Sequence, residues 1–223
     1  MKVNYTTILF DLDGTLTDPK EGITKSAAYA LQKFGIPVEN LDDLCCFIGP
    51  PLIDSFREYY GMDEEQASLA VNYYRERFRE KGILENRLLD GVIPMLQRLS
   101  ERGKRLAIAT SKPEVFARQI AENFGIAPYF DYICGCGLDG ERNTKAEVIS
   151  YALDQYGNPP KSTVVMIGDR KHDIIGAKQN QIASIGVLVG YGSYQELEEA
   201  GADKIVKTIS NLEQLLLCDS SVD

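Results

Sequence analysis

The chain has 223 residues, of which 44% are hydrophobic and 26% charged, so it is long enough to bury a sizeable core without disulfides or a structural metal. Its 33 acidic and 24 basic residues give a net charge of -9, which argues against nucleic-acid binding because that function usually needs a basic face. The five cysteines and single histidine lack zinc-site spacing, and no apolar run is long enough to span a membrane. Since the N-terminal sequence also lacks the pattern of a signal peptide, we expect a cytoplasmic protein with reduced thiols.

The first predicted element is a short apolar strand over Thr7–Phe10, and acidic residues follow it immediately. The next five residues read DLDGT, with carboxylates at Asp11 and Asp13 and a glycine at Gly14. Carboxylates that lie close together make each other harder to ionise. A strand that leads from an apolar run into such a group therefore raises the question of what offsets their repulsion.

The segment from about residue 19 to residue 85 contains helical patterns and no convincing strand. Helices are predicted over residues 22–35, which end at a glycine, and over residues 63–82, whose acidic start and basic end suit the helix dipole. Between them, residues 46–52 are predicted to form a loop because a glycine and two prolines interrupt the sequence.

This helical segment predicts that the chain has two domains. We expect a helical cap over residues 17–86, joined by two hinges to a catalytic core formed by residues 1–16 and 87–223. The tail over residues 218–223 is expected to be frayed.

After the cap, apolar runs alternate with helical patterns. The predicted strands are Leu106–Ala109, Tyr132–Cys134, Val164–Ile167 and Ser184–Val189, and the predicted helices are Glu114–Phe124, Lys145–Tyr156 and Asp173–Gln179. Several runs are apolar almost throughout, which is typical of strands buried on both faces of a parallel sheet. The alternation therefore predicts an α/β sheet with helices on both faces.

Polar residues follow these strands where they end. Thr110 and Ser111 follow the second strand, Lys145 begins the helix after the third, and Asp169 and Asp173 follow the fourth. Ligand sites in open α/β sheets lie beyond the carboxyl ends of the strands. We therefore expect these groups to meet the acids that follow the first strand.

The same segments resemble the four motifs of the haloacid dehalogenase-like hydrolase superfamily. The matching segments are DLDGT at residues 11–15, ATSK at residues 109–112, Lys145 before a helix, and GDRKHD at residues 168–173. Their order and spacing are similar over most of the chain, and phosphoglycolate phosphatase-like and 5'-nucleotidase-like members are the most similar group. The resemblance implies a Rossmann-like, doubly wound parallel sheet with an inserted α-helical cap. It also implies a Mg²⁺-dependent phosphatase that hydrolyses small phosphorylated metabolites, phosphate monoesters, through an aspartyl-phosphate intermediate.

The roles that the resemblance implies for the acids agree with their chemistry. Asp11 would attack phosphorus as the nucleophile. Asp13 would protonate the leaving alkoxide and then accept a proton from water, which requires a raised pKa. The metal ligands would be the side chains of Asp11 and Asp169 and, by resemblance, the backbone carbonyl of Asp13. The acids would then gather because a cation and a phosphoryl group lie among them.

The remaining motif residues would bind the phosphate or orient its ligands. Gly14 lets the backbone approach closely, Thr110 and Ser111 offer hydroxyl groups, and Lys145 offers a cation. Asp173 follows Asp169 by four residues, a spacing that places two side chains on one helical face, so we expect Asp173 to orient Lys145 or a metal-bound water. Ser111 fits equally well as the cap of a helix, with the glutamate three residues later completing a capping box.

Three other functions are alternatives to the phosphatase. A dehalogenase of this superfamily would lack the second aspartate, so Asp13 argues against it. A sugar phosphomutase uses the same motifs and stays open, whereas a non-catalytic phosphate-binding protein would usually have lost one motif residue, and none is missing. Phosphoglycolate, a nucleoside monophosphate and a sugar phosphate all remain candidate substrates, and the oligomeric state is not readable. The segment LVGYGS over residues 188–193 is interpreted as a plain loop, and His172 as a surface or supporting residue.

Overall fold

The computed structural model describes residues 4–138 and 141–217, and the chain divides into two compact units. One unit contains the residues up to Leu16 and from Leu88 onward, and the other contains Thr17–Arg87. The fraying expected for residues 218–223 lies outside the described residues. In the part of the chain that is described, no helix combines the length and the apolar character needed to cross a membrane.

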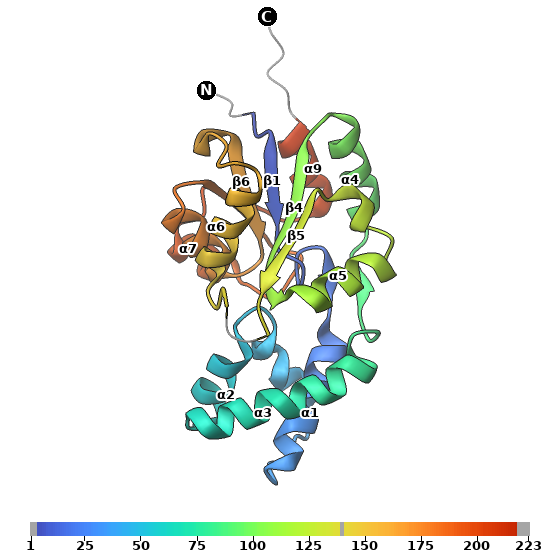
Figure 1. Cartoon of the computed structure of the whole chain (residues 1–223), viewed down its shortest axis with the longest axis vertical. Coiled ribbons are helices and arrows are strands. Elements are labelled where there is room, and N and C mark those ends of the chain that lie inside the picture. The colour runs from blue at the N-terminus through green and yellow to red at the C-terminus, as the bar shows by residue number, and fades with distance from the viewer. Residues whose placement is uncertain (1–3, 139–140, 218–223) are drawn as a thin grey trace, which may run out of the picture. The chain divides into compact units, whose positions relative to one another are not determined.

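The first unit is built on a six-stranded parallel sheet with the strand order β5-β4-β1-β6-β7-β8. Its strands are β1 (Thr7–Phe10), β4 (Arg105–Pro113), β5 (Tyr132–Cys136), β6 (Val164–Gly168), β7 (Ala183–Val187) and β8 (Lys204–Val206). Its helices are α4 (Val92–Glu101), α5 (Glu114–Asn123), α6 (Lys145–Gln155), α7 (Lys171–Gln179), α8 (Tyr194–Ala200) and α9 (Ile209–Leu217), with short 3-10 helices over Ala127–Tyr129 and Lys161–Thr163. Helices α6 and α7 lie on one side of the sheet, and α4, α5 and α9 on the other (Figure 1). The predicted α/β architecture is confirmed.

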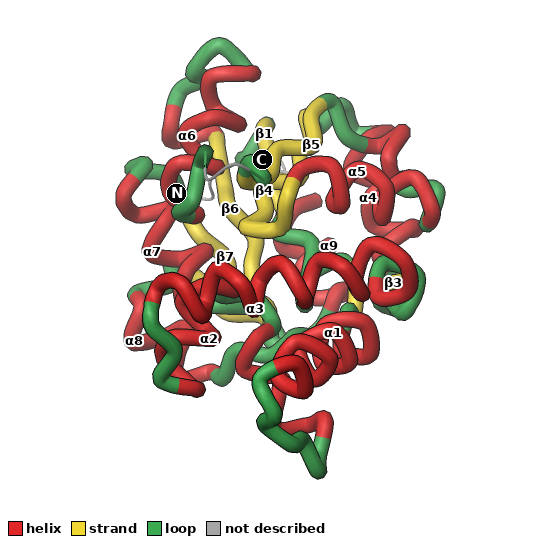
Figure 2. Tube along the Cα trace, turned by 60° about the horizontal axis from the view of Figure 1, so that its bottom comes forward, coloured by secondary structure: helices red, strands yellow, loops and turns green. Residues whose placement is uncertain are grey.

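The path of the chain explains why helices cover both faces of this sheet. From β1 the chain moves outward to β4 and β5, and it then returns across the sheet to β6, β7 and β8. Crossovers between parallel strands are almost always right-handed, so this change of direction moves the connecting helices to the opposite face. Figure 2 shows the strands in yellow between the two groups of helices. The strand order therefore reverses at β1, the point at which doubly wound sheets bind their ligands.

The register of the sheet aligns the ends of its three central strands. Phe10 pairs with Ile108 of β4 and with Ile167 of β6. The amide of Asp11 donates to the carbonyl oxygen of Ile167 at 2.8 Å, so the first acid leaves the sheet beside the end of β6. All four residues of β1 are fully buried, which explains why its sequence is apolar and does not alternate.

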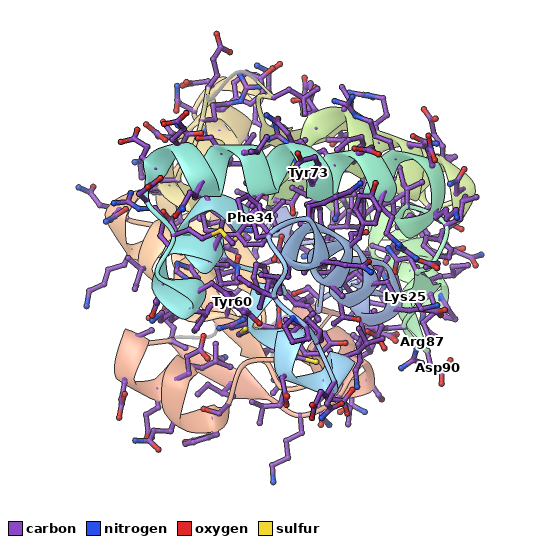
Figure 3. All side chains as sticks on the ribbon, turned by 90° about the horizontal axis from the view of Figure 1, so that it is seen from below. Lys25, Phe34, Tyr60, Tyr73, Arg87 and Asp90 are labelled. Carbon is purple, nitrogen blue, oxygen red and sulfur yellow. The ribbon has the colours of Figure 1, made fainter. Side chains whose placement is uncertain are left out.

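The second unit is helical. It contains α1 (Lys20–Lys33), a 3-10 helix over Leu41–Phe47, α2 (Leu52–Tyr60), α3 (Glu64–Arg77) and a π-helical segment over Phe78–Gly82. Two short strands, β2 (Thr17–Asp18) and β3 (Arg87–Leu88), pair with each other. Helices α1 and α3 pack together, and the rings of Phe34 and Tyr73 meet edge to face with their centroids 6.1 Å apart (Figure 3).

The loop predicted over residues 46–52 is wrong at both ends. Its first residues belong to the 3-10 helix, which the Asn40 side chain caps by accepting from the Asp42 amide at 3.1 Å. Its last residue, Leu52, begins α2. The true loop covers residues 48–51, because the glycine and prolines interrupt only that short stretch.

Candidate active site

Three buried carboxylates meet at the carboxyl edge of the sheet. Asp11 follows β1, Asp169 follows β6, and Asp173 lies in the first turn of α7. One oxygen of each carboxylate lies within 4.8 Å of the other two. Burial, reinforced by the charges of Asp173 and Asp11, raises the pKa of Asp169 to about 8. Burial also raises the pKa of Asp173 to about 6, although Lys145 acts in the opposite direction.

The shared helical face predicted for Asp169 and Asp173 is wrong. Helix α7 begins at Lys171, so Asp169 lies outside it. The two acids meet because one oxygen of Asp173 accepts from the Arg170 amide at 3.1 Å, which holds the start of the helix against the end of β6. The capture of a free amide by an acid in the first turn is a common way to begin a helix.

Lys145 bridges two members of the acid cluster. Its Nζ lies 2.8 Å from Asp11 Oδ1 and 2.8 Å from Asp173 Oδ1, and it donates to the Ala109 carbonyl oxygen at 3.1 Å. Burial acts to lower the pKa of Lys145, but the two carboxylates outweigh it and raise that pKa, so the side chain stays charged. The expected link between Asp173 and Lys145 is therefore present in the geometry.

A local capping motif fixes the position of Lys145, which is the first residue of α6. The Thr144 hydroxyl accepts from the Glu147 amide at 3.2 Å, and Glu147 Oε2 accepts from the Thr144 amide at 2.9 Å. This reciprocal pair satisfies two amides that the helix leaves open at its start.

Asp13 does not join the acid cluster but pairs with Lys112. The distance from Lys112 Nζ to Asp13 Oδ2 is 2.7 Å, and both side chains are buried. Burial raises the pKa of Asp13, the Lys112 ammonium opposes this, and the nearby charge of Asp11 makes a smaller contribution. Burial away from water is thus a larger cause of the raised pKa of Asp13 than repulsion by Asp11. Sequence reasoning missed Lys112 as a site residue, although it lies inside the segment ATSK.

The two hydroxyl residues of that segment lie within β4 itself. The strand continues to Pro113 with an irregular register after Ala109. Thr110 is buried and its hydroxyl accepts from the Lys112 amide at 3.3 Å, whereas the carbonyl oxygen of Ser111 accepts from Cys136 Sγ at 3.0 Å. Within the described residues, neither hydroxyl is hydrogen-bonded to an acid of the site.

The proposed capping role of Ser111 is wrong. Helix α5 begins at Glu114, and the residue that precedes it, Pro113, makes no side-chain capping bond. The hydroxyl of Ser111 is therefore not engaged at the start of α5.

Close backbone contacts surround Asp169. Gly14 has a φ of 83°, and a Cβ there would lie 2.4 Å from Asp169 Oδ2, so both the backbone conformation and the space require glycine. Thr15 Oγ1 donates to Asp169 Oδ1 at 3.3 Å, and the Tyr191 amide donates to Asp169 Oδ2 at 2.8 Å. Residues 188–193 form a loop, as predicted, but the amide of Tyr191 gives this loop a contact with Asp169 that the sequence did not reveal. The signal in the sequence was the pair of glycines on either side of Tyr191.

The charges of the site fit a divalent cation. When all groups are ionised, four carboxylates and two ammonium groups leave an excess of two negative charges on Asp11, Asp13, Asp169, Asp173, Lys112 and Lys145. The oxygens Asp11 Oδ1 and Asp173 Oδ1 lie near Lys145 but without the alignment of a hydrogen bond, so they keep lone pairs available. Buried oxygen donors with excess negative charge are the ligands that Mg²⁺ prefers. Because Asp13 directs its carboxylate to Lys112, its expected part in metal binding rests on its backbone carbonyl.

Buried acids lie beyond the ends of the central strands of a doubly wound sheet, and this arrangement agrees with the family that sequence comparison identifies. The sequence pattern of the haloacid dehalogenase-like hydrolase family matches residues 8–187, and the chain belongs to this family.

Two relatives and one solved structure show which activities are assigned to proteins similar to this chain. A 5'-nucleotidase from Pseudomonas aeruginosa is 48% identical over 214 residues, which cover 96% of each chain. The tyrosine-protein kinase PtkA of Mycobacterium tuberculosis is 38% identical over 211 residues, which cover 94% of this chain and 72% of PtkA. A solved structure, described as a predicted phosphatase from Clostridium acetobutylicum, matches with a TM-score of 0.94 and 51% identity over 96% of this chain and 99% of that one. The family and the likenesses to the 5'-nucleotidase and to the predicted phosphatase indicate phosphatase activity.

Proposed function

We propose that the protein is a Mg²⁺-dependent phosphatase that hydrolyses small phosphate monoesters of cytoplasmic metabolites through a phosphorylated Asp11. The observation that carries this proposal is the position of Asp11, which is buried at the end of a central strand, 2.8 Å from Lys145 Nζ and with an oxygen within 4.8 Å of those of Asp169 and Asp173. A carboxylate in this position is a suitable nucleophile because its neighbours hold it in one orientation.

In the proposed reaction, one acid is the nucleophile and a second acid transfers the protons. An oxygen of Asp11 forms a bond to phosphorus while the ester P–O bond breaks, and the leaving alkoxide takes the proton of Asp13. Water then attacks phosphorus, Asp13 accepts its proton, and Asp11 is released with inorganic phosphate. The raised pKa of Asp13 suits a group that must hold a proton in the first step and lose it before the second.

The other site residues would offset the negative charge of the reacting groups and hold these groups in position. Asp11, Asp169 and the backbone carbonyl of Asp13 would hold Mg²⁺, which when bound offsets the negative charge of the nucleophile and the phosphoryl group. Asp173 holds Lys145 near Asp11, where the ammonium group stabilises the phosphoryl oxygens. Gly14, Thr110 and Ser111 complete the proposed phosphate site.

The helical unit Thr17–Arg87 is proposed as a cap that contributes to the choice of substrate. Nucleoside 5'-monophosphates are the first candidates because the Pseudomonas aeruginosa relative is named a 5'-nucleotidase. Phosphoglycolate and sugar phosphates are the other candidate substrates.

The test measures phosphate released from these esters, with Mg²⁺ and with a chelator, by the wild-type protein and by Asp11→Asn. We expect metal-dependent release that the substitution abolishes. Asp90→Asn, which changes an exposed acid of the same unit, serves as the control and should keep wild-type activity. A fully active Asp11→Asn variant would rule out the proposed nucleophile.

One comparison favours a second candidate, in which the phosphoryl group passes from Asp11 to an acceptor other than water. The relative PtkA is named a tyrosine-protein kinase, and a phosphomutase would likewise transfer the group to a hydroxyl. Incubation with a hexose 1-phosphate separates a phosphomutase from a phosphatase, because a mutase yields the isomeric sugar phosphate whereas a phosphatase yields free phosphate.

A further inference from the structure

The loop Gly190–Gly192, between β7 and α8, contacts the acid that follows β6. The Tyr191 amide donates to Asp169 Oδ2 at 2.8 Å. On the other side of the same carboxylate, Thr15 Oγ1 donates to Asp169 Oδ1 at 3.3 Å. Asp169 is fully buried, so water does not replace either hydrogen bond. Each carboxylate oxygen is thus held by one donor, and its remaining lone pairs point in a fixed direction.

The two glycines of the loop make this contact possible. A Cβ at Gly190 would lie 2.2 Å from Asp169 Oδ2 and 2.2 Å from the carbonyl oxygen of Gly14. A Cβ at Gly192 would lie 1.8 Å from the carbonyl oxygen of Asp169. These neighbours are backbone atoms and a buried carboxylate, so they have little room to move aside. Any side chain at either position would displace the loop or turn Asp169.

We propose that Gly190, Tyr191 and Gly192 form a positioning loop that orients the Asp169 carboxylate for binding a divalent cation. The loop would act through its contact with the Asp169 carboxylate. Groups that orient a metal-ligating carboxylate commonly affect metal affinity by about 10- to 100-fold. The inference rests on the proposed function only in placing the cation among the acids.

The test measures the dissociation constant for Mn²⁺ by calorimetry on chelator-treated protein, without any substrate. We expect Gly190→Ala to bind Mn²⁺ at least about tenfold more weakly than the wild type, and Asp169→Asn to mark the loss caused by removing the ligand itself. Tyr191→Phe keeps the backbone amide and should bind as the wild type does. In activity assays, Gly190→Ala should need more Mg²⁺ for half-maximal rate.

Gly186→Ala is the matched control for a merely structural effect. Gly186 lies in β7 just before the loop, and the three atoms nearest to its Cβ would all belong to the side chain of Leu197, the first at 2.8 Å. We expect it to lower the melting temperature and to leave the Mn²⁺ dissociation constant unchanged. If Gly190→Ala fails to fold, Tyr191→Pro removes the amide donor without adding a Cβ at position 190, and weaker binding is expected there.

The outcomes separate this inference from the proposed function. If the wild type binds Mn²⁺ and the folded loop variants bind it equally well, the positioning role is wrong while the phosphatase proposal stands. If the wild type binds no Mn²⁺, the acids are not a metal site, and both proposals fail at that point.

Discussion

At the scale of single residues, the pair formed by Asp13 and Lys112 controls how readily Asp13 holds a proton. Burial raises the pKa of Asp13, and the ammonium group at 2.7 Å limits that rise. Replacing Lys112 by methionine removes the positive charge and leaves an uncharged side chain of similar length. The pKa of Asp13 should then rise further, so the first step, which needs protonated Asp13, should persist to higher pH.

The measurement for this prediction is the pH dependence of kcat/KM for Lys112→Met. We expect the alkaline limb to move to higher pH, whereas Lys161→Met, which changes an exposed lysine, should leave it in place. An alkaline limb that stays fixed or moves to lower pH would show that Lys112 does not act on the proton of Asp13.

Asp169 links the stability of the metal-free protein to pH. Its pKa rises from 3.8 to about 8 on folding, so between these values the folded state holds a proton that the unfolded state has lost. The free energy of unfolding should therefore fall as pH increases from about 4 to about 8, by on the order of a few kcal/mol. Asp169→Asn removes the titrating group and should flatten this dependence. Urea unfolding with a chelator present measures the free energy of unfolding at pH 5 and at pH 8. An equal change between these two pH values in the wild type and in Asp169→Asn would contradict the prediction.

The acids were predictable from sequence because each lies in a short local motif at the end of a strand. Lys112 and Tyr191 were missed because their roles depend on partners far away in the chain, Asp13 and Asp169. A sequence pattern shows which residues are neighbours along a strand. It does not show which backbone amide points at a buried carboxylate.

At the scale of elements, the start of α6 sets the position of Lys145. The capping box of Thr144 and Glu147 holds this first turn. Thr144→Ala should lower the free energy of unfolding by about 1 kcal/mol because it leaves an amide without its acceptor. Chemical denaturation measures the change, and Ser150→Ala, at an exposed position of the same helix, should change stability by less than about 0.5 kcal/mol. Equal effects of the two substitutions would contradict the prediction.

The elements that were recognised are a fully apolar strand and a long helix with charged ends, whereas the helix that was missed is short, although its apolar residues lie on one face. The continuous apolar run of β1 and the long pattern of α3 were both recognised. Helix α2 was missed because it is short and directly follows two prolines, which favour a loop interpretation. Strand β4 continues through Pro113 because pairing with β5 resumes after an irregularity, an effect of tertiary structure that local propensity does not contain.

At the scale of the whole molecule, the negative charge of the site links metal binding to stability. A cation that binds the folded protein and not the unfolded chain stabilises it in proportion to the logarithm of its concentration. The melting temperature should therefore rise as Mg²⁺ is added above its dissociation constant, and Asp169→Asn should lose most of this rise. Thermal unfolding with Mg²⁺ and with NaCl at matched ionic strength tests the prediction. A rise of the same size in NaCl would show charge screening and no bound ion.

The class of fold and the family were readable from the sequence because strand ends and motifs occur in a fixed order. The substrate was not readable, because the motifs at the strand ends concern only the phosphoryl group and its leaving oxygen. By the family resemblance, phosphatase and phosphomutase reactions would use the same aspartate. What distinguishes them is the acceptor, which the motifs do not encode.

The central place of β1 has a consequence for the newly made chain. Phe10 pairs with Ile108 and Ile167, so β1 leaves the ribosome long before either of its neighbours. At about 5–20 residues per second, roughly 5 to 20 s pass before β4 is available and roughly 8 to 30 s before β6 is available. Until β4 is made, the apolar segment TILF has no strand to pair with, which makes it a target for chaperones and a hazard for aggregation. No nascent chain that ends before Gly192 contains every part of the site.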